Sequence, residues 1–417
     1  MPRKTSTLII ISLIILIIIA GSAYWFLFMR QSGNNVSSNT PSSDSTFSPF
    51  NRNNGKQGSN STNNSTSTDA SSGQVVLPSL RLLSATPIGG YGASTTASTT
   101  FVRWVDRGRG NILEAYGNLS DITTLSNTLL PRTYESIWNK DLSSFIGTIL
   151  GDDNQTISTL FASIAPQATS SSGAPYQLQG KNLPDGIVSY ASSPKKDKVF
   201  LFIIQNGQGV GYIAPFNGGT AIQIFSTPVT QVNVEWPEDN TIAITTKGSA
   251  AYNGFLYFVS PKTGVWKKIL GPLAGLSTKV SHDAKYVLAS ATDGSDGLLT
   301  AIYSVASSTS NDAVIKTLAD KCTWGNFYKE VVYCAVPFKP VSGSYPDDWY
   351  RGNISTIDKM WQINAKNSEI HLISSIFTEA KRNIDAYNLG LDTKDNYLFF
   401  MNKADLSFWS LDLVTAK

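Results

Sequence analysis

Residues 231–270, QVNVEWPEDNTIAITTKGSAAYNGFLYFVSPKTGVWKKIL, contain four short segments with the pattern of β-strands. VNVEW alternates apolar and polar residues, TIAITT is rich in β-branched residues, and GFLYFVS and VWKKIL complete the set. The segments between them, PEDN, KGSAAYNG and SPKTG, carry the Gly, Pro, Asn and Asp that turns require. The stretch therefore predicts a four-stranded meander, and one such sheet needs neighbours to cover its faces.

Similar units repeat along the chain on both sides of this stretch. They occupy residues 88–130, 133–180, 186–228, 231–270, 276–320, 322–376 and 383–414. The outer strand of the fifth unit is expected at 313–320, AVIKTLAD, and the last unit stops one strand short. Residues 77–84, LPSLRLLS, have no strand partner of their own and can supply the missing edge. We therefore expect an all-β fold, a seven-bladed β-propeller closed by its N-terminal strand.

A recurring pattern of an inner strand followed by a turn strengthens this interpretation. It appears in IWNKD, YASSPKKD, EWPEDN, VSHDAK and LGLDTKD, followed by a hydrophobic strand and by an aromatic one such as FLYFVSPKTG or FWSLDLV. In this pattern residues 77–417 resemble the WD40-like blades of TolB-type and peptidase-associated propellers, although the GH and WD dipeptides of true WD40 repeats are missing. The chain is also similar to membrane-anchored bacterial propeller proteins without an assigned activity. The resemblance implies the fold and a tendency to bind macromolecules or peptides, and it assigns no catalytic residue.

The N-terminal region has a different composition. Residues 8–29 form an uncharged apolar run, long enough to cross the hydrocarbon core of a membrane as a helix. Arg3 and Lys4 precede it, so the positive-inside rule places residues 1–7 in the cytoplasm and the rest of the chain outside. A cleaved signal peptide is the alternative, because Gly21 and Ala23 offer small residues before a cut. Since YWFLF continues the apolar run after them, we favour an uncleaved signal anchor.

The next segment, residues 30–74, is rich in Ser, Asn and Thr and shows no apolar periodicity. Such a segment cannot build a core, so we expect a disordered linker, with the propeller domain at 75–417. The sequence thus predicts a single-pass protein of the cell membrane with an extracytoplasmic C-terminal domain.

The overall charge and the known catalytic motifs exclude several functions. The net charge is +3 and the basic residues are scattered, so no nucleic-acid partner is expected. His282 and His371 are the only histidines, and neither belongs to an HExxH motif or lies beside a GxSxG nucleophile. The fragment DGSDG at 293–297 resembles part of a calcium loop but lacks the distal Glu, and a hairpin turn explains it better. We expect no cofactor, no metal and no catalytic residue.

The two cysteines, Cys322 and Cys334, lie in KCTWGNFYKEVVYCAV. A hairpin centred on Tyr328 would place them directly opposite each other on adjacent strands. Outside the cytoplasm they are candidates for a disulfide, and a pair of buried free thiols is the alternative.

One face of the expected ring gathers the candidate binding residues. Strand direction alternates within a blade, so the turns between second and third strands share a face with the connections between blades. That face is predicted to carry Arg107, Arg109, Asp152, Asp153, Tyr252, Asp293, Asp296 and Asp405. It also receives the longest insertion, 341–353, VSGSYPDDWYRGN, whose candidate binding residues are Tyr345, Asp347, Asp348, Trp349, Tyr350 and Arg351. Aromatic and charged side chains on a loop are typical of recognition, and a loop that packs on its own blade around Trp349 is the alternative.

Three functional hypotheses follow. The leading one is a non-catalytic binding or scaffolding propeller, tethered outside the membrane, that recognises a protein, peptide or glycan. The alternative is a hydrolase or lyase acting on envelope polysaccharide through carboxylates such as Asp347 and Asp348. In the third, the domain only spaces other components of an envelope assembly.

Overall fold

The computed structural model describes residues 77–97, 99–166, 175–292, 294 and 297–415. The predicted cytoplasmic segment 1–7, membrane span 8–29 and linker 30–74 lie outside the described residues. Within the described ranges, no helix has the length and apolar character needed to cross a membrane.

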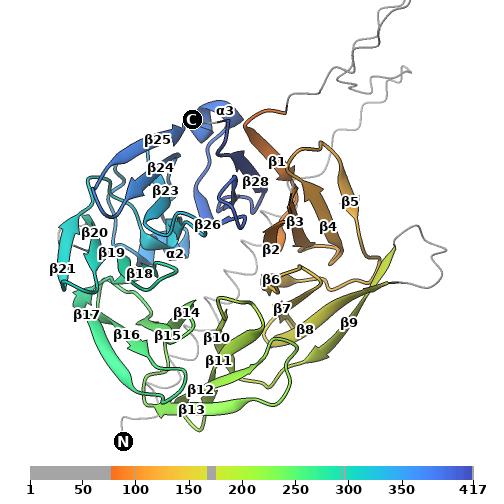
Figure 1. Ribbon diagram of the computed structural model, residues 1–417, viewed down its shortest axis with the longest axis horizontal. Helices are drawn as coiled ribbons and strands as arrows, with labels where there is room; N and C mark the ends of the chain where they lie inside the picture. The colour runs from red at the N-terminus through yellow and green to blue at the C-terminus, as the bar shows by residue number, and fades with distance from the viewer. Residues whose placement is uncertain (1–76, 98, 167–174, 293, 295–296, 416–417) are drawn as a thin grey trace, which may run out of the picture. The chain divides into compact units, whose positions relative to one another are not determined.

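The described residues form seven four-stranded antiparallel sheets arranged around a ring, as predicted (Figure 1). In each of the first six blades the strands follow one another in sequence from the centre outward. The strands of the first three blades are β2 (Ile88–Thr95), β3 (Thr100–Asp106), β4 (Ile112–Tyr116) and β5 (Ile122–Thr124); β6 (Thr133–Trp138), β7 (Ser144–Leu150), β8 (Ile157–Pro166) and β9 (Tyr176–Asn182); and β10 (Ile187–Ser192), β11 (Lys198–Gln205), β12 (Gln208–Pro215) and β13 (Ile222–Thr227).

The remaining blades follow the same plan, with three short helical segments in their connections. Their strands are β14 (Val232–Glu238), β15 (Thr241–Thr246), β16 (Asn253–Val259) and β17 (Trp266–Ala274); β18 (Ser277–Val280), β19 (Tyr286–Thr292), β20 (Leu298–Ser304) and β21 (Thr309–Asp312); β22 (Cys322–Trp324), β23 (Val331–Pro337), β24 (Asp358–Asn364) and β25 (Ile370–Ser374); and β26 (Ala386–Leu391), β27 (Tyr397–Asn402), β28 (Phe408–Asp412) and β1 (Leu80–Ser84). The helical segments are η1 (Ala319–Lys321), α2 (Asp347–Arg351) and α3 (Ile376–Ala380).

The core lies between neighbouring blades rather than in one central layer. Phe200 and Phe202 of β11 pack in one apolar cluster with Ile242 and Ile244 of β15, in the next blade. A second strand is covered on both faces by adjacent blades, so its sequence is a continuous apolar run, as in KVFLFIIQ of β11. Outer strands such as β21, TSND, are exposed along their whole length.

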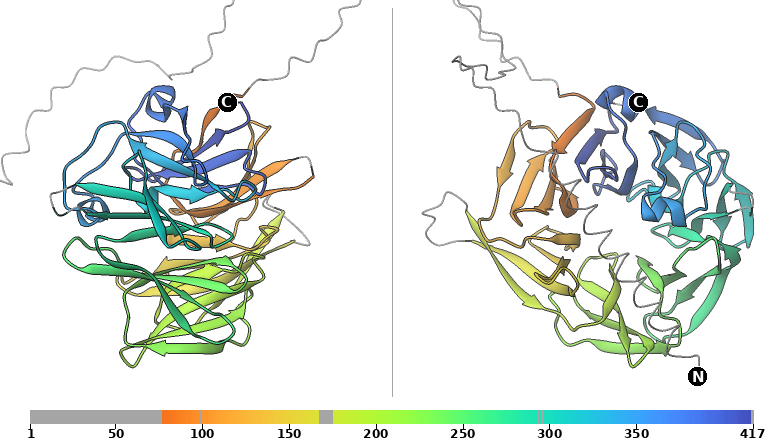
Figure 2. Two further views of the ribbon diagram at one scale, coloured as in Figure 1. Left: turned by 60° about the vertical axis from the view of Figure 1, so that its left-hand side comes forward. Right: turned by 180° about the vertical axis from the view of Figure 1, so that it is seen from behind.

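The first strand closes the ring. β1 pairs antiparallel with β28, with Leu80 opposite Leu411 and Ser84 opposite Phe408. The strands lie side by side in Figure 1 and, seen from behind, in Figure 2. This confirms the predicted closure. It pairs the backbone N–H and C=O groups that β28 would otherwise expose at the edge of its sheet.

The outer strand of the fifth blade differs from the prediction. It is β21, Thr309–Asp312, and not the segment 313–320. Ala313 and Ile315 belong to the cluster between the fifth and sixth blades, and Leu318 is 1% exposed. The alternating apolar residues of AVIKTLAD therefore pack into the ring instead of forming an edge strand, and they lead the chain inward to η1.

The cysteine register agrees with the expected hairpin. Cys322 of β22 lies directly opposite Cys334 of β23, and their Cα atoms are 4.1 Å apart. The structure joins their sulfur atoms in a disulfide.

We predict that the closure can be tested with two leucines of β1. Leu80 is 8% exposed and belongs to the core cluster of the last blade, whereas Leu82 is 43% exposed. Leu80→Ala should lower the free energy of unfolding by about 2 to 5 kcal/mol, because it leaves a cavity beside β28. The matched control Leu82→Ala should cost about 1 kcal/mol or less. Chemical denaturation followed by tryptophan fluorescence measures both, and a larger cost for Leu82→Ala would show that β1 pairs one residue out of this register.

The disulfide has its own test. A thiol assay in denaturant should find no free thiol in the full-length chain before reduction and two after it, because Cys322 and Cys334 are its only cysteines. Two free thiols in the unreduced protein would contradict the bond.

Candidate functional site

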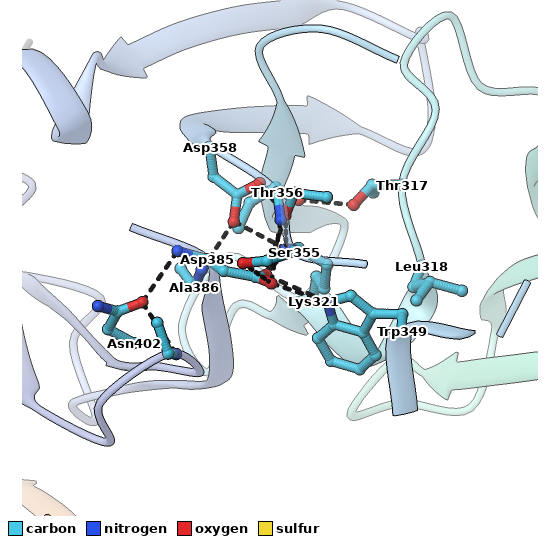
Figure 3. A network of polar contacts seen from close by, with 12 residues as sticks. Thr317, Leu318, Lys321, Trp349, Ser355, Thr356, Asp358, Asp385, Ala386 and Asn402 are labelled. Atoms are coloured by element: carbon cyan, nitrogen blue, oxygen red, sulfur yellow. Dashed lines mark hydrogen bonds and ion pairs between the residues drawn. The ribbon is translucent and has the colours of Figure 1, made fainter. Parts of the chain in front are cut away.

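The insertion between β23 and β24 reaches the inner side of the ring. It contains α2, which lies beside the inner strands β18 and β26 in Figure 1. A buried polar cluster beneath α2 explains this position (Figure 3).

Lys321, at the end of η1, is the centre of this cluster. It is 1% exposed, and its Nζ donates to Thr356 Oγ1 at 2.6 Å, to Asp385 Oδ1, and lies 2.8 Å from Asp358 Oδ2. These partners come from the connection before β24, from β24 itself and from the segment before β26. One ammonium group therefore ties the fifth-to-sixth blade connection to the sixth and seventh blades.

Asp385 joins α2 to the cluster. Trp349 of α2 is 3% exposed, and its Nε1 donates to both carboxylate oxygens of Asp385 at 3.1 Å. Ser355 Oγ and the Thr356 backbone N–H donate to Asp385 Oδ2, at 3.0 and 3.1 Å. The position of α2 is therefore fixed by hydrogen bonds to a buried charge.

The two carboxylates of the cluster differ in protonation behaviour. Burial alone would raise the pKa of Asp385, but the Lys321 charge and the surrounding donors outweigh it and lower that pKa. Burial raises the pKa of Asp358, and the neighbouring Asp385 charge adds to this effect while Lys321 opposes it. Asp385 is thus the ionised partner that balances Lys321 most directly.

Most of the predicted binding residues hold the insertion together. Tyr345 is 5% exposed, and its hydroxyl donates to the Val341 carbonyl at 2.8 Å. Asp347 accepts the backbone N–H of Ala250 at 2.6 Å, which anchors α2 to the fourth blade. These residues and Trp349 face the protein rather than solvent.

The other three predicted residues lie at the surface of α2. Asp348 accepts the Ser344 backbone N–H at 2.8 Å, and the Asn353 side chain as well. Arg351 is exposed, and its guanidinium group lies 3.8 Å from the Asp347 carboxylate. Tyr350 is 40% exposed, and its hydroxyl donates to Asp320 at 3.0 Å. Of the six predicted residues, Tyr350 is therefore the aromatic one that solvent reaches.

Tyr350 belongs to the wall of a cavity of about 490 Å³ inside the ring. The wall combines aromatic rings with side chains of both charges. It is formed by Tyr134, Glu135, Lys279, Asp320, Cys322, Trp349, Tyr350, Tyr387, Asn388, Leu389, Met401 and Lys403. The inner strands β6, β18, β22 and β26 supply seven of these twelve residues, and the last blade alone contributes five.

Enclosure by protein changes the acidity of groups in this wall. Glu135 is accessible from the cavity, yet burial raises its pKa, and the Lys279 charge only partly opposes this. Burial raises the pKa of Tyr387 to about 12, with Arg107 acting in the opposite direction. Burial and then the Asp320 charge raise the pKa of Tyr350. Groups with shifted pKa values in a cavity are typical of binding and catalytic sites.

The sequence missed most of this wall. Glu135, Lys279 and Tyr387 stand in short inner strands, where a polar residue resembles the solvent-facing half of an alternating pattern. The signal that could have found them is a polar or aromatic residue on the exposed side of several first strands at once. Among the residues predicted for this face, Arg107 stacks on the ring of Tyr134, with its Cζ 3.8 Å from the ring centroid. Asp293 and Asp296 lie outside the described residues.

No metal site is formed by the described residues, in which no group of three His, Cys, Asp or Glu side chains could hold an ion.

Comparisons with known proteins show the fold. No protein-family model matches the sequence, and no curated protein matches it. The oligogalacturonate lyase of Vibrio parahaemolyticus superposes with a TM-score of 0.52 and 10% identity, over 81% of this chain and 92% of the lyase. The propeller domain of the trilobed protease of Pyrococcus furiosus superposes with a TM-score of 0.49 and 12% identity. This match covers 77% of this chain and 94% of the protease domain.

Acinetobacter baumannii TolB is also similar, with a TM-score of 0.41 and 11% identity over 63% of this chain. The match spans 59% of the TolB chain. A match with a puromycin-hydrolysing peptidase of Mycobacterium tuberculosis spans 50% of the peptidase chain. At 10% identity, the match with the lyase shows a shared fold and carries no residue roles.

We predict that Asp385→Ala lowers the free energy of unfolding by about 3 to 5 kcal/mol, because it leaves Lys321 buried without its main partner. Asp312→Ala is the matched control, since Asp312 pairs with Lys316 in an exposed ion pair, at 2.8 Å. It should change the free energy by about 1 kcal/mol or less. Chemical denaturation compares the two variants, and equal costs would mean that the Lys321 cluster does not hold α2.

Proposed function

We propose that this protein is a binding or scaffolding propeller, tethered to the outside of the cytoplasmic membrane, that takes a protein, peptide or glycan partner into the cavity beside α2. The observation that carries the proposal is the composition of the cavity wall. Tyr134, Tyr350 and Tyr387 offer flat rings for apolar or sugar-ring contact, while Lys279 and Glu135 offer charges of both signs. This combination suits a polar ligand with an apolar face.

The buried cluster beneath α2 supports the same conclusion. A wall that is fixed before the ligand arrives loses little conformational entropy on binding. Trp349 and Asp385 fix α2 in this way, and Tyr350 is the next residue along the helix. Its ring is therefore held at the cavity without being buried in the core.

The location outside the membrane rests on the sequence. The apolar run 8–29 with Arg3 and Lys4 before it supports a signal anchor, and the polar tract 30–74 supports a spacer that separates the propeller from the lipid surface.

The alternative function, a hydrolase or lyase acting on envelope polysaccharide, is favoured by one observation. A general acid that works near neutral pH needs a raised pKa, and burial gives Glu135 one inside the cavity. The carboxylates that the sequence suggested fit this role less well. Hydrogen bonds from Asn353 and Ser344 lower the pKa of Asp348, and Asp347 is engaged with the Ala250 backbone. The candidate acid of an enzyme would therefore be Glu135.

We predict that Tyr350→Ala weakens partner capture by about tenfold, because it removes an exposed ring from the cavity wall. Tyr252→Ala is the matched control, since Tyr252 is 76% exposed on the same face, in the β15–β16 connection, and is not part of the wall. Crosslinking in cells that express the full-length chain, followed by quantitative mass spectrometry, compares recovery of each partner. Trp349→Ala is unsuitable for this purpose, because loss of its buried ring would also destabilise the fold.

The result separates the hypotheses. A partner that is lost with Tyr350→Ala and kept with Tyr252→Ala supports binding in the cavity. The same partners in equal amounts from all three proteins would contradict it and favour a purely structural spacer. If the full-length chain shortens envelope polysaccharides, and Glu135→Gln abolishes this turnover while the fold is retained, the enzymatic alternative replaces the proposal.

A further inference from the structure

A second pocket lies at the other end of the inner strands. It has a volume of about 330 Å³. The turns that join first and second strands in the third to sixth blades form most of its wall. These turns lie on the face of the ring opposite to α2. The residues of this lysine pocket, as we call it, are Ser192, Ser193, Pro194, Lys196, Glu235, Trp236, Pro237, Val280, His282, Asn326 and Lys329.

Two lysines of this pocket have no carboxylate partner among the described residues. Lys196 and Lys329 form no ion pair there, whereas the neighbouring Lys195 lies 3.3 Å from Asp239. Lys196 is half-buried, and burial lowers its pKa, whereas Lys329 is exposed at the rim. An enclosed ammonium group without a counter-charge is unfavourable, because it has lost part of its hydration and gained no partner.

The remaining charged groups around the pocket do not neutralise these lysines. Glu235 is the only carboxylate of its wall, and its Oε2 lies 3.9 Å from Lys279 Nζ. Burial raises the pKa of Glu235, while the Lys279 charge opposes this. Lys279 thus offsets the carboxylate, and Lys196 and Lys329 remain in excess.

His282 reports the resulting positive potential. Burial, and then the charge of Lys279, lower its pKa to about 4, against the effect of a hydrogen bond with the Trp324 backbone. The charges of Lys196 and Lys329 act in the same direction as Lys279. The imidazole is therefore neutral at pH 7. The lysine charges that lower its pKa would attract a negatively charged group to the pocket.

Trp236 contributes its ring to the wall, while its own hydrogen-bond donor is buried. Trp236 is 8% exposed, and its indole Nε1 has no partner among the described residues. A buried donor left without an acceptor costs about 1 to 3 kcal/mol. Because that nitrogen is itself closed to solvent, the lysines, and not the indole, are what the pocket offers to an oxyanion.

We propose that the lysine pocket binds an oxyanion, the phosphate or carboxylate group of a small ligand. Lys196 and Lys329 would contribute the charge, and His282 would lie beside the bound group. This site is separate from the cavity beside α2, so the proposal stands or fails independently of the proposed function.

The two histidines of the chain provide a direct measurement. The full-length protein with labelled histidine rings should show two sets of ring resonances at pH 7, one from His282 and one from His371, which is exposed on β25. His371→Gln identifies them by removing one set. Inorganic phosphate, and in a second titration glucuronate, should shift the His282 signal to saturation at constant ionic strength and leave the His371 signal unchanged.

Matched lysine variants locate the site. Lys196→Gln and Lys329→Gln should each weaken the Kd by about tenfold, because each removes one uncompensated charge. Lys195→Gln should leave it unchanged, since Lys195 is adjacent in sequence but exposed and paired with Asp239. Melting temperatures of all variants verify that the fold is retained.

Each outcome of these titrations supports or contradicts the proposed site. Saturation with phosphate alone, or with glucuronate alone, supports the site and names its preferred anion. If neither probe shifts the His282 signal at concentrations up to about 20 mM, far above the Kd of a functional small-ligand site, the proposal is wrong. It is also wrong if Lys195→Gln weakens binding as much as the other two variants, because the effect would then come from the general surface charge.

Discussion

The pairing of β1 with β28 is the constraint on which the rest of the structure depends. Each blade buries apolar side chains on both faces of its sheet, as the cluster shared by Phe200 of β11 and Ile242 of β15 shows. No blade can therefore be terminal without exposing a core face, and a linear array of seven would have two such ends. The ring removes both, and the strand that begins the domain supplies the hydrogen bonds of its last sheet. Closure also brings the first strands of all blades around one centre, and residues from distant parts of the chain form the two pockets at its ends.

Within that ring, the Lys321 cluster adds specificity more than stability. Burying an ammonium group and two carboxylates costs several kcal/mol in lost hydration, and the ion pairs roughly offset this cost when their geometry is good. The benefit is positional. Apolar side chains can pack against one another in many ways, because their contacts have no fixed direction. Hydrogen bonds do have a direction, so the bonds among Lys321, Asp385 and Trp349 require one arrangement of η1, α2 and the segment before β26. The cluster therefore sets where α2 lies in the ring, and with it the shape of the cavity that Tyr350 borders.

The sequence predicts the repeating part of this structure well and the central part poorly, for a physical reason. Period-two alternation and turn residues are local signals, so the blades, the β1 closure and the opposition of Cys322 to Cys334 could be predicted from short segments. The Lys321 cluster joins residues up to 64 positions apart, and a lysine is normally expected at the surface, so nothing in LADKC marks it as buried. The same locality explains the error at 313–320: alternation predicts a strand, but it does not say whether the strand lies at an edge or turns into the core.

The two ends of the inner strands show why the fold does not settle the function. Lys279 lines the cavity beside α2, and its charge acts on Glu135 there, on Glu235 in the wall of the lysine pocket, and on the nearby His282. One inner-strand side chain, 37% exposed, thus contributes to the electrostatics of both ends. A shared fold at 10% identity therefore does not carry a function to this chain.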